Sequence, residues 1–448
     1  MQIDEPIKWQ TVIPESLRQP ALEVARDVAE RLRDPERTAE IARLGSEQSG
    51  LDVKRQIQWT PFSVVYGHAA PALLFGQMDH CFPGQEWDRL AHTYLVLAAR
   101  SLETVPDLAL GPSLFGGLAG LCFTTHYLSR NGVRYRRLLG TLDELLFRQT
   151  VEVARLPDPF PSGVTFNDYD LISGPAGIGA YLLLRLKAPR VDQALDAVIN
   201  RLLFLSERRA DGHLRFFIPP EWQPTEHHLE QYPRGATDCG LAHGVPGPLA
   251  FLSLAHLNGV ERPGLREAIR RLADWIVAQQ YEDDWGANWP YAVPPDGIQS
   301  PESSTRSAWC YGSPGVARAL WLAGCALQDG ELQDVAIEAL RAVRRRPIKI
   351  RRIDAPILCH GVAGLLQIVL RFANDTGQHF FVEMATELTQ QLLGLFEPDS
   401  LAGFRDIEPD GRKVDNPGLL EGAVGAALTL LAAATDVEPA WDRMFLLS

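Results

Sequence analysis

Two cysteines and one histidine are the residues of this sequence best suited to metal chemistry: Cys310, Cys359 and His360. Thiolate sulfur and imidazole nitrogen favour zinc over magnesium or calcium. Three protein ligands with a fourth position open are typical of a catalytic zinc site, because structural sites use four. The wide spacing between the two cysteines matches no zinc finger, so only the fold could bring them together.

A short glycine-rich motif recurs along the chain and predicts such a fold. Its copies follow one another at intervals of about fifty to seventy residues, as in proteins built from stacked like units. The second residue of every copy is glycine, from Gly67 to Gly422. The seven copies are YGHAA from Tyr66, GGLAG from Gly116, SGPAG from Ser173, HGVPG from His243, YGSPG from Tyr311, HGVAG from His360 and EGAVG from Glu421.

The residue just before each motif is a cysteine in two adjacent copies only. In order these residues are Val65, Phe115, Ile172, Ala242, Cys310, Cys359 and Leu420. Equal positions in neighbouring repeats lie side by side, so we predict that Cys310 and Cys359 are neighbours and that His360 joins them. Without the repeat, buried core cysteines would be the better interpretation. We expect core thiols at Cys81, Cys122 and Cys325, and the sequence leaves Cys239 undecided.

The charge of this donor set indicates the type of reaction. Two thiolates and a neutral imidazole already balance a zinc ion, so a thiol that enters as the fourth ligand would be deprotonated yet remain electron-rich. Such a site suits alkylation of a thiol better than hydrolysis.

Four further polar residues lie at or near the motif copies: Asp170, His243, Arg306 and Tyr311. A histidine can relay a proton to a developing enolate, and a carboxylate can orient it. An arginine can stabilise an oxyanion. Each also has a structural interpretation, as a helix cap, a surface charge or a packing aromatic. Together with a metal, the four residues favour a catalytic role.

Alternating helices must position these residues. Each motif copy is followed by a run rich in Ala and Leu, such as 178–186, 248–257, 316–327 and 365–372, which predicts a buried helix. Between the copies, amphipathic segments predict outer helices at 20–34, 88–102, 136–156, 191–205, 265–281, 332–346 and 381–396. Seven inner and seven outer helices favour an all-α fold, an α/α toroid built as a double ring. We expect one domain over 1–448, with small insertions in the loops before the third to fifth repeats.

Composition and charge exclude several classes of protein. A formal net charge of −13 argues against a nucleic-acid partner. A basic cluster at 341–352 could receive an acidic peptide, although a solvated helix end followed by a loop at Pro347 is the preferred interpretation. The most apolar stretch, 423–434, is far shorter than the ~20 residues of a membrane-spanning helix. The N-terminus shows no secretory signal, so we expect a cytoplasmic protein.

The blocks SAWCYGSPGVARALWLAG, ILCHGVAGLLQI and GLAHGVPGPLAFLSLA resemble the signature blocks of LanC-type lanthionine synthetases, as do DLISGPAGIGAYLL and LLEGAVGAALTLL. The resemblance extends from about Tyr66 to the C-terminus. It implies zinc-dependent addition of cysteine thiols to dehydroalanine or dehydrobutyrine in a ribosomally made precursor peptide, with formation of lanthionine or methyllanthionine. It places the metal ligands at Cys310, Cys359 and His360, the acid/base histidine at His243 and its aspartate at Asp170. Arg306 and Tyr311 match the arginine and tyrosine that line the family's site.

The resemblance also implies partners for this chain. A dehydrated precursor peptide with its leader would be the substrate, and a separate dehydratase and an exporter would act beside the cyclase. Such a biosynthetic complex would place the cytoplasmic protein at the membrane periphery. The sequence shows no strand-rich block that would match the small β-rich insertion of family members.

Three other functions remain open from the sequence. A LanC-like enzyme that adds glutathione to dehydrated residues of proteins would keep every site residue. An α/α-barrel glycosidase would need paired carboxylates, for which Asp170 and Glu421 could serve, but it would leave the cysteines of adjacent repeats unexplained. A non-catalytic peptide-binding scaffold would bind no zinc.

Overall fold

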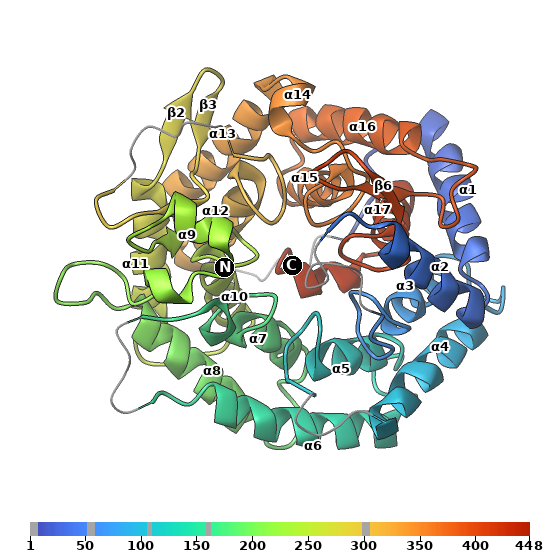
Figure 1. Cartoon of the computed structure of the whole chain (residues 1–448), viewed down its shortest axis with the longest axis horizontal. Helices are drawn as coiled ribbons and strands as arrows, with labels where there is room; N and C mark the ends of the chain where they lie inside the picture. The colour runs from blue at the N-terminus through green and yellow to red at the C-terminus, as the bar shows by residue number, and fades with distance from the viewer. Residues whose placement is uncertain (1–7, 52–58, 105–109, 158–162, 298–304) are drawn as a thin grey trace. The chain divides into compact units, whose positions relative to one another are not determined.

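The predicted alternation of apolar and amphipathic helices is confirmed by the computed structural model, which describes residues 8–51, 59–104, 110–157, 163–297 and 305–448 (Figure 1). The apolar runs after the motif copies form helices that we call the core helices: α3 (Ala69–Cys81), α5 (Leu118–Tyr127), α7 (Pro175–Leu184), α10 (Pro246–Leu257), α12 (Ser313–Leu327), α15 (Val362–Thr376) and α17 (Ala423–Ala434). The amphipathic segments form the cover helices: α1 (Glu15–Arg31), α4 (Trp87–Ser101), α6 (Arg136–Val153), α8 (Val191–Ser206), α11 (Leu265–Ala278), α13 (Gly330–Arg345) and α16 (His379–Gly394).

Burial separates the two kinds of helix as their sequences predict. Every residue of α17 is buried, and so are the first twelve residues of α15, which begins at Val362. The cover helices α11 and α13 bury only one face each, and their charged residues cover the other. Prolines begin or nearly begin three core helices, at Pro175, Pro246 and Pro314. A missing N–H costs little there, because the first turn of a helix has no internal partner for it.

The described residues form two compact units. The first comprises Met1–Leu110, Gly120–Leu139 and Ile353–Asp442. Within it α17 contacts α15 and α3, while α16, α1 and α4 pack on α15, α17 and α3 respectively. The N-terminal helix α1 therefore covers the last core helix of the chain.

The second unit comprises Gly111–Ala119, Gly140–Arg352 and Arg443–Ser448. Within it α10 contacts α7 and α12, while α8, α11 and α13 pack on α7, α10 and α12 respectively. The arrangement of core and cover helices is thus the same in both units. In each unit a central core helix contacts two others, and each of the three carries one cover helix.

Several elements were not predicted. They include α2 (Pro35–Gln48), α9 (Glu226–Gln231), α14 (Ile348–Arg351) and the 3-10 helices η1 (Leu102–Thr104), η3 (Phe166–Asp168), η4 (Pro220–Trp222) and η5 (Ala440–Phe445). Asp34 caps α2 by accepting from Glu36 N and Arg37 N, and Pro35 is its first residue. Part of the loops predicted before the third and fifth repeats, 158–162 and 298–304, lies outside the described residues.

The strands among the described residues are short and form three antiparallel pairs. β1 (Thr237–Asp238) pairs with β4 (Ala292–Val293), β2 (Tyr281–Asp283) with β3 (Gly286–Asn288), and β5 (Arg405–Ile407) with β6 (Lys413–Asp415). The first two pairs lie in segments between core helices α7 and α12, where the sequence predicts insertions. The β5–β6 hairpin lies between α16 and α17.

The basic cluster at 341–352 is only partly solvated. Arg346 and Arg351 are buried, at 1% and 9% exposure. Arg346 Nε donates to Asp283 Oδ2 (2.8 Å), and Arg351 Nε donates to Arg346 O (2.9 Å). These two arginines hold the β2–β3 hairpin and the loop after α13, so the prediction of a solvated cluster is wrong for them. No helix among the described residues is long and apolar enough to span a bilayer.

Candidate functional site

The glycine at the second position of the motif lets the chain fold back before each core helix. A Cβ at Gly312 would lie 1.7 Å from Arg306 O, and one at Gly361 would lie 2.3 Å from Ala355 O. Side-chain carbons do not approach backbone oxygens so closely, so any larger residue would force the loop open. Gly312 also has φ +91°, in the left-handed region that favours glycine. The constant glycine therefore fixes where the preceding residue sits.

Backbone hydrogen bonds join residues at the same position of successive repeats. Phe115 N donates to Ile172 O (3.4 Å) and Ala242 N to Cys310 O (3.3 Å). Cys359 N donates to Leu420 O (2.9 Å). For these pairs, the prediction that equal repeat positions are neighbours is confirmed.

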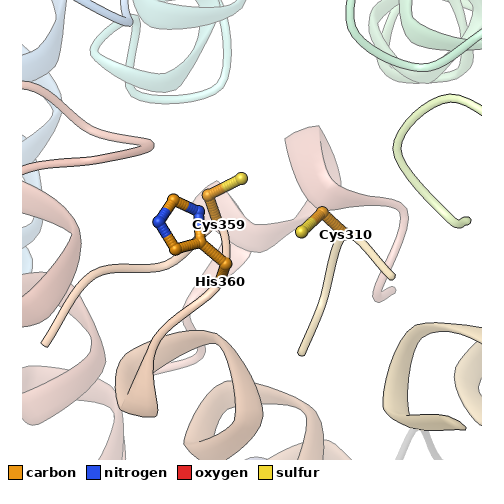
Figure 2. A group of neighbouring side chains, drawn as sticks. All are labelled: Cys310, Cys359 and His360. Carbon is orange, nitrogen blue, oxygen red and sulfur yellow. The ribbon is translucent and has the colours of Figure 1, made fainter. Parts of the chain in front are cut away.

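Cys310, Cys359 and His360 form the one group of possible metal ligands found among the described residues. Each offers one ligand atom, and these atoms all lie within 4.8 Å of one another (Figure 2). Cys310 is buried, and Cys359 and His360 are half-buried. Trp309 Nε1 donates to Phe445 O (3.1 Å) and so anchors the residue next to Cys310. These three side chains could hold a metal ion.

His243 and Asp170 form a direct pair, although 73 positions separate them in the chain. His243 Nδ1 lies 2.6 Å from Asp170 Oδ2. Asp170 Oδ1 accepts from Ser173 N and Gly174 N, both at 2.7 Å, so the carboxylate also shapes its own motif loop. Because a carboxylate accepts at Nδ1, that nitrogen carries the proton and Nε2 is left for chemistry.

The surroundings of His243 make it a stronger base than a free histidine. Burial lowers its pKa, but the hydrogen bond that it donates to Asp170 and the charges of Asp170, Asp238 and Cys310 together raise the pKa above its usual value. Its side chain is still 31% exposed, while Asp170 is fully buried. Phe166 stacks on the imidazole with ring centroids 4.6 Å apart. The ring is therefore fixed in place yet open on one side.

Tyr311 reaches a buried carboxylate that the sequence analysis missed, Asp238. Tyr311 Oη donates to Asp238 Oδ2 (2.9 Å), and Gly240 N donates to Asp238 Oδ1 (2.7 Å). Burial raises the pKa of Asp238 to about 6, although these bonds and the nearby His243 oppose the rise. Burial and the Asp238 charge also raise the pKa of Tyr311 well above its usual value, so Tyr311 stays protonated. Asp238 stands five positions before His243, and this proximity was the available signal.

Arg306 is linked to Tyr311 through Tyr291. Its backbone N donates to Tyr291 Oη (3.3 Å), and the Tyr291 ring lies 5.2 Å from the Tyr311 ring. Among the described residues, we find no hydrogen bond between the Arg306 guanidinium and His243, Tyr311 or the three possible metal ligands. Its part in catalysis stays a prediction.

Further polar side chains lie near Cys359 and His360. Tyr66 Oη donates to Glu421 Oε2, and these two residues open the first and seventh motif copies. Burial raises the pKa of Glu421, and the bond from Tyr66 opposes that rise. Asp406 Oδ1, on β5, lies 3.9 Å from His360 Nε2. The sequence indicates Glu421 only as a possible glycosidase carboxylate, and it gives no signal for Asp406.

The other four cysteines lie outside this group of possible ligands, as far as the described part of the chain shows. Cys122 and Cys239 are buried, whereas Cys81 and Cys325 are half-buried. Burial raises the pKa of Cys81 to about 11 and that of Cys239 well above its usual value. Neither of these two thiols is activated for nucleophilic attack. The environment of Cys239 therefore indicates a core thiol.

Comparisons with known proteins agree on one family. A family model described as lanthionine synthetase C-like protein matches residues 58–446. The nisin biosynthesis protein NisC of Lactococcus lactis subsp. lactis is 28% identical over 303 residues, which span 65% of this chain and 70% of that protein. The solved structure of nisin cyclase matches with a TM-score of 0.76 and 23% identity, covering 95% of this chain and 98% of that chain. The structural match confirms the predicted all-α, α/α-toroid fold.

Proposed function

This chain belongs to the lanthionine synthetase C-like family, and on that premise we propose that it is a zinc-dependent lanthipeptide cyclase. It would add cysteine thiols of a ribosomal precursor peptide to dehydroalanine or dehydrobutyrine and so close lanthionine or methyllanthionine rings. The observation that carries the proposal is the clustering of Cys310, Cys359 and His360 in a chain of this family.

The donor set fits zinc. Zinc binds thiolate sulfur at about 2.3 Å and imidazole nitrogen at about 2.0–2.1 Å. The three ligand atoms lie within 4.8 Å of one another, so small side-chain movements would let them share one ion. Two sulfurs and one nitrogen leave a fourth tetrahedral position for a substrate. When bound, zinc supplies the acidity that makes an entering cysteine thiol a thiolate at neutral pH.

The reaction balances without a redox partner. The thiol S–H bond breaks, a bond forms from sulfur to the β-carbon of the dehydrated residue, and the α-carbon gains a proton. The protein must therefore move one proton and stabilise the enolate charge that develops in between.

The His243–Asp170 pair is suited to the proton transfer. Its raised pKa keeps a larger share of His243 protonated near neutral pH, so Nε2 can deliver a proton to the α-carbon. Asp170 holds the ring through Nδ1 and stabilises the imidazolium. We propose that Arg306 and Tyr311 line the same site, Arg306 by stabilising the enolate oxygen and Tyr311 by binding the peptide.

The proposed partners follow from this reaction. The substrate would be a dehydrated precursor peptide with its leader, supplied by a separate dehydratase and passed on to an exporter. We propose a cytoplasmic enzyme, peripheral to the membrane through that complex, and one toroid domain over 1–448. No nucleic acid takes part.

A thiol assay tests the function. The purified protein is mixed with a dehydrated peptide that contains cysteine, and loss of free thiol is followed together with the unchanged mass expected for an addition within one molecule. A parallel reaction offers glutathione and a dehydrated peptide without cysteine. We expect rapid thiol loss in the first reaction only. Reaction in the second alone would favour a glutathione-adding enzyme, and no reaction in either would contradict the proposal.

A further inference from the structure

Asp406 lies beside the histidine of the proposed metal site. Its Oδ1 is 3.9 Å from His360 Nε2, and the side chains of Asp406 and His360 are 17% and 21% exposed. Figure 2 shows the other ring nitrogen, Nδ1, on the side of Cys359, whereas Nε2 lies on the opposite edge of the ring. The two nitrogens of His360 therefore face different partners.

The β5–β6 hairpin holds Asp406 in a fixed position. Asp406 pairs with Val414 across the hairpin. Glu408, just after β5, accepts from Gly50 N (2.8 Å) and from Ser49 Oγ beyond the end of α2. Glu408 is only 7% exposed. The hairpin is thus fastened to α2 by a buried carboxylate.

A second fastening comes from the turn after α16. Glu397 pairs with Arg405 (3.1 Å) and with Lys413 (2.7 Å), one residue on each strand of the hairpin. Asp406 Oδ1 accepts from Ile407 N (2.8 Å), which restricts the rotation of the carboxylate. Because both strands of the hairpin are held, the Asp406 carboxylate stays at one edge of the His360 imidazole.

We propose that Asp406 is a positioning residue for His360: it takes the Nε2–H and so presents Nδ1 to the metal. This inference rests on the proposed zinc site. Histidines that bind metals usually donate their other ring N–H to a carboxylate or carbonyl, which fixes the tautomer and orients the ring. A separation of 3.9 Å exceeds a direct hydrogen bond, so the contact must shorten on metal binding or include one water.

Zinc affinity tests the inference without any peptide substrate. Zinc is titrated into the metal-free protein in competition with a chromophoric chelator. We expect Asp406→Ala to weaken zinc binding by about 10–100-fold, as other such partners do. Asp406→Glu, which keeps the carboxylate, should restore most of the affinity. Asp410→Ala, in the exposed turn of the same hairpin, is the matched control and should bind like wild type.

The outcomes separate this inference from the function on which it rests. Wild-type protein that binds no zinc would contradict the proposed function itself. Zinc binding by wild type and equal affinity of Asp406→Ala would overturn the role of Asp406 alone. Should Asp406→Ala fail to fold, Asp406→Val replaces it, because valine suits a strand and has no acceptor atom. Unchanged affinity of that variant would overturn the role as well.

Discussion

His243 and His360 occupy the same position in two repeats, yet their rings face carboxylates with different nitrogens. Each opens a motif copy, HGVPG in the fourth repeat and HGVAG in the sixth. His243 faces a carboxylate with Nδ1, at 2.6 Å from Asp170. His360 faces one with Nε2, at 3.9 Å from Asp406. On the proposed function, the first arrangement would leave Nε2 for proton transfer, and the second would leave Nδ1 for a metal.

The residue before each histidine explains why only His360 is proposed to bind a metal. Ala242 offers no ligand, whereas Cys359 places a sulfur beside His360. The source of the carboxylate differs as well. Asp170 comes from the loop of the preceding motif copy, and Asp406 comes from a hairpin inserted between α16 and α17. On the proposed function, the neighbours of this one scaffold position would decide whether its histidine relays a proton or binds a metal.

Removing the cysteine sulfur of the sixth repeat should abolish the difference between the two histidine sites. Of the changes considered, it should have the largest effect on activity. Cys359→Ala changes CHG into AHG, the sequence of the fourth repeat. We expect loss of bound zinc and of cyclisation, because one sulfur and one nitrogen hold the ion far less well. Metal analysis of the purified variant measures this. Cys325→Ala, which alters a thiol that Gln333 Nε2 contacts at 3.4 Å, should keep its zinc.

Removing the relay histidine should separate the two roles. We expect His243→Asn to retain zinc but to close rings about 10²–10⁴-fold more slowly, the usual contribution of a positioned proton donor. Single-turnover rates with a dehydrated peptide measure the effect. The exposed His227 on α9 provides the control, since His227→Asn should react normally. A full rate in His243→Asn would remove the histidine from the mechanism.

Neutralising Asp170 should shift the pH dependence. The raised pKa of His243 keeps its imidazolium present above pH 6.5, and activity as a general acid is lost as the pH rises through that pKa. Asp170→Asn lowers the pKa, so the loss of activity should begin at lower pH. At a pH above the His243 pKa of both wild type and Asp170→Asn, the rate of the variant should be lower by about tenfold for each pH unit by which the pKa falls. A pH–rate profile that does not move would contradict the pairing.

Neutralising Asp238 should move the same profile less. Its charge contributes to the raised pKa of His243 after the two contributions of Asp170. With a pKa of about 6, Asp238 is mostly ionised at neutral pH. We therefore expect Asp238→Asn to shift the profile in the same direction and to slow the reaction less than tenfold at pH 7. A shift larger than that of Asp170→Asn would reverse the order of influence proposed for the two carboxylates.

The repeat explains why so much of the fold could be predicted. The glycine at the second position of every motif copy marks a loop that turns back on its own backbone. The apolar run after each copy is typical of a buried helix. The core and cover helices therefore followed from the pattern, and so did the proximity of Cys310, Cys359 and His360. His243 and Asp170, which the family resemblance pairs, are in contact in the structure, and their catalytic roles stay a prediction.

Residues outside the repeat pattern could not be placed in the same way. Asp406 lies on a hairpin of two three-residue strands, too short for alternation to predict. Asp238 precedes a motif copy, but its bond to Tyr311 depends on how the fourth and fifth motif loops meet. Arg346 stands in a row of basic residues that is typical of a solvated helix end, but it is buried and pairs with Asp283. Each of these contacts joins segments that sequence periodicity does not relate.

X-ray absorption at the zinc edge of the resting enzyme tests the central claim most directly. Two sulfur neighbours at about 2.3 Å and imidazole nitrogen at about 2.0–2.1 Å are the expected result. A protein purified without zinc, or a zinc shell with fewer than two sulfur atoms, would contradict the account.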